Sequence, residues 1–239
     1  MKRAVNCGLV KADNMKQAIL LLSFGTPRHP SDLLPYLTSI RRGKVPTERE
    51  LAALTARYDA IGQWDNVTLQ TMGNEQKNKL ETILGIDSVC LAYLHMPNSM
   101  EQAVESIAAA GYTSILSIVT SPFYSMVGTG AYERKLQSIL QAYPYISSES
   151  IKSWWDQPQF FEYWCSQLVA ANPLQADTAC IFSAHSVPIS TVGTYEDEVI
   201  SASNRIAKTI GLNHWYQAWQ SAAPYGEWLG PTIESIIEQ

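Results

Sequence analysis

The feature of this sequence that most restricts its fold is the alternation of short apolar segments with longer segments of helical periodicity. The first apolar segment, Met15–Ser23, contains the uninterrupted run Ala18–Leu22 and ends at a Phe-Gly-Thr-Pro turn. Such a run is typical of a strand that is buried on both faces of a parallel sheet. Further strands are predicted at residues 89–94, 114–119, 180–184 and 216–220.

Amphipathic helices are predicted between these strands. Met100, Ala103, Val104 and Ile107 lie at helical spacing on one face, and Gly111 marks a helix end. The other helical patterns lie at residues 33–42, 48–60, 131–142, 160–171, 199–210 and 231–238. Strands that alternate with helices indicate the α/β class with doubly wound parallel sheets.

We therefore expect two Rossmann-like lobes with parallel sheets flanked by helices. The first is predicted at residues 15–172 and the second at residues 177–239, with a hinge over 172–176. Because few strands are predicted in the second lobe, we expect it to be incomplete, with an exposed sheet edge that can pair with another chain.

The composition excludes several classes of protein. A hydrophobic content of 46% and a charged content of 16% fit a globular chain, and a net charge of −5 does not fit a nucleic-acid binder with a basic face. The longest apolar run is too short to cross a bilayer, and residues 1–14 lack the apolar core of a secretory signal, so we expect a cytoplasmic protein. The cysteines, at positions 7, 90, 165 and 180, are too widely spaced for a zinc finger or an iron–sulfur motif. No tightly bound cofactor is expected.

Ligands of open α/β sheets bind beyond the carboxyl ends of the strands. At one such end, Ser183-Ala184-His185-Ser186 offers hydroxyl groups and an imidazole. No phosphate-binding pattern with clustered glycines occurs at any predicted strand end, which weakens a nucleotide-binding interpretation. A flavodoxin-like module that binds a phosphate ligand remains an alternative from the fold alone.

Several motifs resemble those of one enzyme family. The segment Phe182-Ser183-Ala184-His185-Ser186-Val187-Pro188 is very similar to the ferrochelatase motif that carries the catalytic histidine. Trp219-Gln220-Ser221, followed by Glu227-Trp228-Leu229-Gly230-Pro231, resembles the family's second long motif. Further matches in family order are residues 24–27, 40–43, 57–62 and 153–155. The resemblance covers residues 15–239, and the Ile-Arg-Arg-Gly segment is closest to the bacterial branch that uses coproporphyrin.

This resemblance implies an enzyme of heme biosynthesis with a porphyrin and Fe²⁺ as substrates. It implies that His185 is the catalytic residue and the metal ligand, and a neutral imidazole can indeed accept a pyrrole proton or bind iron. The residues that match porphyrin-binding positions are Phe24, Arg41, Arg57, Tyr58, Asp65 and Tyr132. His95 matches a further family histidine.

Each assignment has a structural alternative. A histidine at a strand end can simply be hydrogen-bonded within the fold, and the same holds for His95. Arg41 can be the cationic end of a helix, which the helix dipole favours. Arg57 and Tyr58 can belong to a solvated helix face.

The sequence also departs from the family in three places. Phe24 stands where the coproporphyrin branch has a tyrosine, and its ring has no oxygen to offer to iron. Asp65 replaces a serine, and its carboxylate can repel propionates. The sequence stops at Gln239, before the family's glutamate that faces the histidine. We therefore expect weak or no iron insertion from this chain, and a non-catalytic porphyrin- or heme-binding homologue is the alternative.

Overall fold

The computed structural model describes residues 16–62, 64, 68–171 and 178–238. The chain divides into two compact units. The first contains the described residues up to Ser117 together with Ile139–Ser150, and the second contains Ile118–Ser138 together with the described residues from Ile151 onward. No helix in these ranges is long and apolar enough to span a membrane.

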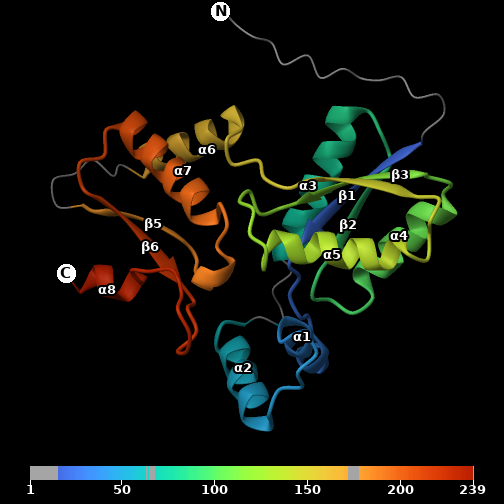
Figure 1. The fold of residues 1–239 in the computed structure, drawn as a ribbon, viewed down its shortest axis with the longest axis horizontal. Coiled ribbons are helices and arrows are strands. Elements are labelled where there is room, and N and C mark those ends of the chain that lie inside the picture. Colours follow the sequence, from blue (N-terminus) through green and yellow to red (C-terminus); the bar gives the residue numbers. More distant parts are fainter. Residues whose placement is uncertain (1–15, 63, 65–67, 172–177, 239) are drawn as a thin grey trace, which may run out of the picture. The chain divides into compact units, whose positions relative to one another are not determined.

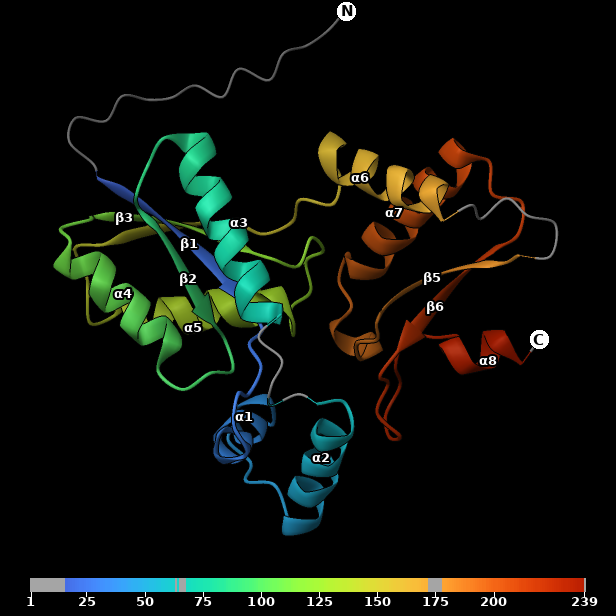
Figure 2. The ribbon, with the colours of Figure 1, turned by 180° about the vertical axis from the view of Figure 1, so that it is seen from behind.

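The first unit is built on a four-stranded sheet with the order β2-β1-β3-β4 (Figures 1 and 2). Its strands are β1 (Gln17–Ser23), β2 (Val89–Tyr93), β3 (Ser114–Val119) and β4 (Ser147–Ile151). β1 pairs in parallel with β2, with Ile19 opposite Val89. The strand lies between two neighbours, and residues 18–22 are each no more than 7% exposed. The prediction of a buried parallel strand is confirmed.

The helices of the first unit follow the predicted pattern in part. α1 (Leu33–Ile40) and α2 (Glu48–Ala60) form a contacting pair, and α3 (Thr68–Leu84) and α4 (Ser99–Ala109) both pack against β2. The predicted apolar face of α4 is buried, and Gly111 adopts the left-handed conformation just beyond the helix end, with φ of 75°. α5 (Thr129–Leu140) follows β3, and most of it belongs to the second unit.

The second unit contains a parallel pair of strands, β5 (Cys180–His185) and β6 (Trp215–Gln220), with His185 opposite Gln220. Within it, α6 (Pro158–Ala170) packs against α7 (Tyr195–Ile210), and both α7 and α8 (Ile233–Ile237) contact β6. Figures 1 and 2 show α7 on one side of the two strands and α8 on the other. The α/β class with parallel strands flanked by helices is therefore confirmed.

Two elements were missing from the sequence prediction. β4 has the polar sequence Ser-Ser-Glu-Ser-Ile, and it is an edge strand of its sheet. Edge strands are often polar, because they are more exposed to solvent than central strands. α3 is long but mostly polar, and Gly73 is its only buried residue among those described. Its weak apolar stripe gives little periodic signal.

The compact units follow different boundaries from the predicted lobes at 15–172 and 177–239. α6 lies before the predicted boundary, yet it packs against α7. The segment after β3 also belongs with the second unit, because the Tyr124 amide donates to the Glu198 carboxylate at 3.1 Å. Contacts between segments that are distant in the sequence set these boundaries. The predicted hinge at 172–176 lies outside the described residues.

Candidate active site

His185 is the last residue of β5, and its side chain is exposed at the carboxyl end of the strand. Its Nδ1 lies 2.8 Å from the Ser186 carbonyl oxygen. Because a carbonyl oxygen can only accept, Nδ1 must donate the proton of this hydrogen bond. In the neutral ring the lone pair is then on Nε2, where it can accept a proton or bind a metal ion.

The backbone around His185 is held from three directions. The Tyr195 hydroxyl donates to the His185 carbonyl oxygen at 3.0 Å. The Ser186 amide donates to Gln220 of the neighbouring strand at 2.8 Å, and the Ser186 hydroxyl donates to the Leu229 carbonyl at 2.9 Å. These hydrogen bonds fix the direction in which the strand ends, and thus the position from which the imidazole projects.

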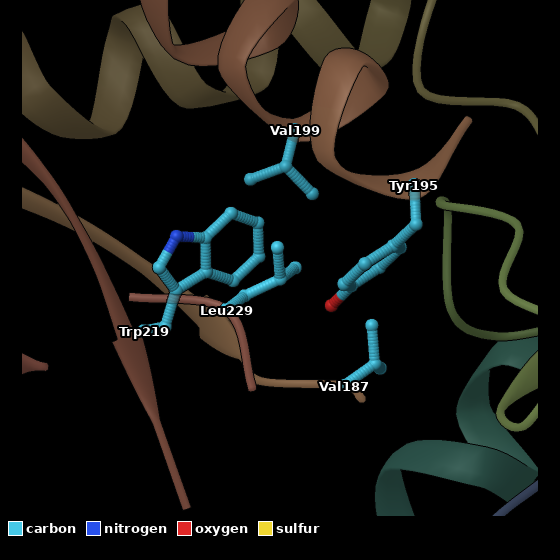
Figure 3. Packing of buried hydrophobic residues seen from close by; sticks show 5 residues of the cluster. All are labelled: Val187, Tyr195, Val199, Trp219 and Leu229. Carbon is cyan, nitrogen blue, oxygen red and sulfur yellow. The ribbon is translucent and has the colours of Figure 1, made fainter. Parts of the chain in front are cut away.

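An apolar cluster lies behind this strand end. Figure 3 shows its side chains, Val187, Tyr195, Val199, Trp219 and Leu229, converging between α7 and the strands. Trp219 is 1% exposed, and its ring lies 5.7 Å from that of Tyr195. Burial raises the pKa of Tyr195 to about 12, so its hydroxyl keeps its proton and remains a donor near neutral pH. The cluster thus positions a polar group that holds the candidate catalytic residue.

The second family-like segment completes this support. The Leu229 amide donates to the Val187 carbonyl at 3.1 Å, and the Trp219 amide donates to the Pro231 carbonyl at 2.8 Å. Pro231 was predicted to open the last helix, but α8 begins at Ile233 with Thr232 as its cap. The peptide bond before Pro231 is cis. The turn at residues 229–231 is therefore hydrogen-bonded to the ends of β5 and β6, and α8 begins only after this turn.

Glu198, on α7, is a carboxylate that sequence reasoning did not select. One of its oxygens accepts hydrogen bonds from the Tyr124 amide and from the Ser153 hydroxyl at 3.0 Å, and the other accepts from the Thr194 hydroxyl at 3.0 Å. It is therefore engaged in holding the loop after β3. Within the described residues, no three His, Cys, Asp or Glu side chains gather as a metal-binding group.

In the first unit, Phe24 follows β1, and its ring is 47% exposed. It lies 4.4 Å from the His95 ring and 6.4 Å from the Tyr36 ring. Nδ1 of His95 is 2.9 Å from the Ser39 hydroxyl. Burial lowers the pKa of His95 to about 4, so this imidazole is neutral near pH 7. The group combines an exposed aromatic surface with a neutral imidazole.

Arg41 lies at the C-terminal end of α1 and forms an ion pair with Glu50 of α2 through Nη1. Its Nε is buried and has no hydrogen-bond partner. Glu50 also closes a capping box with Thr47. The Thr47 amide, and next the Arg41 guanidinium, lower the pKa of Glu50 to about 2. The Arg41–Glu50 pair therefore ties the two helices together and leaves one N–H edge of the guanidinium for another acceptor.

The remaining predicted residues lie in different environments. Arg57 is exposed on α2, and the neighbouring Tyr58 ring lies 5.5 Å from Trp64. Tyr132 of α5 is only 6% exposed, and burial raises its pKa. Asp65 lies outside the described residues. The structure gathers Phe24 with His95 and ties Arg41 to Glu50, while His185 belongs to the other unit, so a cleft shared by His185 and Arg57 stays a prediction.

Sequence reasoning missed the supporting residues more than the site residues. Tyr195 and Glu198 carry no motif of their own. The Thr47-x-x-Glu50 capping box was a readable signal, because this spacing precedes many helices. The hydrogen bond from Tyr195 to His185 had no comparable signal.

Comparison with known proteins identifies the family. A model of the ferrochelatase family matches residues 16–239. The chain is 32% identical over 233 residues to the coproporphyrin III ferrochelatase of Halalkalibacterium halodurans, covering 92% of this chain and 75% of that protein. It is 31% identical over 237 residues to the coproporphyrin III ferrochelatase of Staphylococcus aureus, covering 92% of this chain and 76% of that one.

A solved structure with a similar fold is that of SirB from Bacillus subtilis with Fe³⁺. The TM-score is 0.57 with 10% identity, over 94% of this chain and 71% of that chain. At this identity the likeness concerns the fold alone. The family model and the curated relatives together establish that this chain is an enzyme of the ferrochelatase family.

Proposed function

We propose that this chain inserts Fe²⁺ into coproporphyrin III in heme biosynthesis. The observation that carries the proposal is its identity of 31–32%, over 92% of the chain, to coproporphyrin III ferrochelatases of two bacteria. The exposed imidazole at the end of β5 is in keeping with it, since metal insertion requires that two pyrrole N–H groups lose their protons.

We assign the metal-side role to His185. With Nδ1 donating to the Ser186 carbonyl, the free Nε2 can take a pyrrole proton or guide the ferrous ion. The hydrogen bond from Tyr195 fixes the backbone and limits the directions in which the ring can point. A positioned general base typically contributes about 10²–10⁴-fold to a rate.

We assign the binding of the macrocycle to the first unit. The exposed ring of Phe24 offers a flat apolar surface for a porphyrin face. Arg57 offers an exposed guanidinium and Tyr58 a phenol to propionates. Arg41 holds Glu50 through Nη1, and a propionate at its other edge would give the buried Nε a partner.

The test is iron insertion measured by the loss of coproporphyrin III fluorescence. His185→Ala is expected to abolish insertion while circular dichroism and porphyrin binding are retained. His214→Ala is the matched control, because His214 is also exposed and its backbone carbonyl accepts from the Cys180 amide at 3.0 Å, a hydrogen bond that the change of side chain leaves in place. Undiminished insertion by His185→Ala would refute the assignment. A Soret shift without insertion by the unaltered chain would instead support a non-catalytic porphyrin-binding protein.

A further inference from the structure

A small pocket of about 160 Å³ lies beside the ends of β1 and β2. Its lining residues are Thr26, Arg28, Gln70, Tyr93, Met96 and Ser99. All of these lining residues belong to the first unit. None of them is among the residues assigned to the porphyrin or to iron.

Within the described residues, two polar groups of this pocket make no hydrogen bond: Oε1 of Gln70 and the guanidinium of Arg28, a residue that is exposed to solvent. Oε1 of Gln70 is buried and makes no hydrogen bond. The backbone amide of Arg28 donates to Asp32 at 2.9 Å, but within the described residues the Arg28 guanidinium makes no hydrogen bond or ion pair. A buried amide without a partner costs free energy, and a guanidinium offers five donors. A ligand that accepts from the guanidinium would also be bound by Gln70 once its amide is turned so that Nε2 faces the ligand.

The other polar groups show which kind of ligand fits. Burial raises the pKa of Tyr93, so its phenol keeps its proton and remains a hydrogen-bond donor. The positive charge of Arg28 acts on this pKa in the opposite direction, which indicates that the two groups are close enough to interact. Oγ of Ser99 accepts from the Tyr93 amide at 3.0 Å, which leaves the hydroxyl proton free to donate. Among the described residues that line the pocket, none carries a carboxylate. Rotation of the Gln70 side-chain amide by 180° exchanges Oε1 and Nε2, and the buried position then carries N–H donors. The wall therefore suits an anion.

We propose that this pocket binds a carboxylate group. A carboxylate carries a single negative charge, which one guanidinium balances, and its two oxygens match the fork of an arginine. A phosphate dianion would leave one charge unbalanced among neutral donors. The carboxylate can be an arm of the tetrapyrrole, a source that rests on the function proposed above, or a free small carboxylate, a source that does not.

The experiment is a titration of the whole chain, labelled with ¹³C at its methionine methyl groups, with sodium propionate at constant ionic strength. The Met96 signal, assigned by its loss in Met96→Leu, is expected to shift with saturation. Arg28→Gln and Gln70→Leu should each weaken propionate binding about 10- to 100-fold, as expected for a lost charge-assisted or buried hydrogen bond. Arg49→Gln, at an exposed arginine of α2, should leave it unchanged.

A second titration with coproporphyrin III separates the two sources. Weaker coproporphyrin binding by Arg28→Gln, but not by Arg49→Gln, assigns the carboxylate to the tetrapyrrole. Unchanged coproporphyrin binding beside a lost propionate response assigns it to a free carboxylate. A Met96 signal that does not saturate, or that responds equally in Arg28→Gln, overturns the site. A chain that binds no porphyrin refutes the proposed function and leaves the propionate result intact.

Discussion

Replacing Tyr195 with Phe tests how the fold holds the candidate catalytic histidine. The change removes the hydroxyl that donates to the His185 carbonyl at 3.0 Å and keeps the ring in its apolar cluster. A hydrogen bond of this kind contributes about 1 kcal/mol net. The change should therefore increase local opening of the strand end about fivefold.

Hydrogen exchange of the Ser186 amide reports this opening directly, because that amide donates to Gln220 at 2.8 Å. We expect about fivefold faster exchange in Tyr195→Phe and a reduced kcat for iron insertion with little change in KM. Tyr163→Phe is the control, since it removes a hydroxyl from a ring that is 56% exposed on α6. Equal exchange at Ser186 in the variant and the unaltered protein would show that the hydroxyl does not hold the strand end.

Two further outcomes are expected in the first unit. Arg57→Gln should raise KM for coproporphyrin III roughly 5- to 10-fold without changing kcat, whereas Arg49→Gln should not, and an unchanged KM would contradict the assignment of Arg57. The pKa of Glu50 is lowered to about 2 in the folded chain, so its stabilisation of α2 should be full above its ordinary value of 4.5 and be lost as the pH falls towards about 2. The difference in helix content between the unaltered protein and Glu50→Gln, followed by circular dichroism, should shrink over this interval, and a constant difference would exclude the mechanism.

The sequence was most informative where burial is continuous. The run Ala18–Leu22 predicted a strand that is buried on both faces, and β1 is such a strand, because its consecutive side chains, which point to opposite faces, are all buried. The periodic apolar positions of α4 predicted its buried face and its end at Gly111. By contrast, β4 was missed because an edge strand needs little apolar surface, and α3 was missed because it buries little of its own.

Polar positions were harder to interpret from the sequence. The motif around His185 indicated the residue, and the β-strand pattern before it indicated that the side chain lies at a strand end. The Arg41 side chain was read as a propionate contact or as a helix-end cation, whereas in the fold it also pairs with Glu50. In the sequence, a cationic side chain has many potential partners along the chain, and only the approach of α1 to α2 selects Glu50.

The sequence by itself determined the α/β class, most of the strands, the family and the identity of the candidate catalytic residue, because apolar periodicity and short motifs are local properties of the chain. Only the tertiary structure decided the supports of that residue. Tyr195 lies ten positions after His185, and its hydroxyl donates to the His185 carbonyl. Leu229 lies forty-three positions after Ser186, and its carbonyl accepts from the Ser186 hydroxyl. Such hydrogen bonds depend on how α7 and the turn before α8 pack against β5 and β6, and this packing involves segments that are distant in the chain.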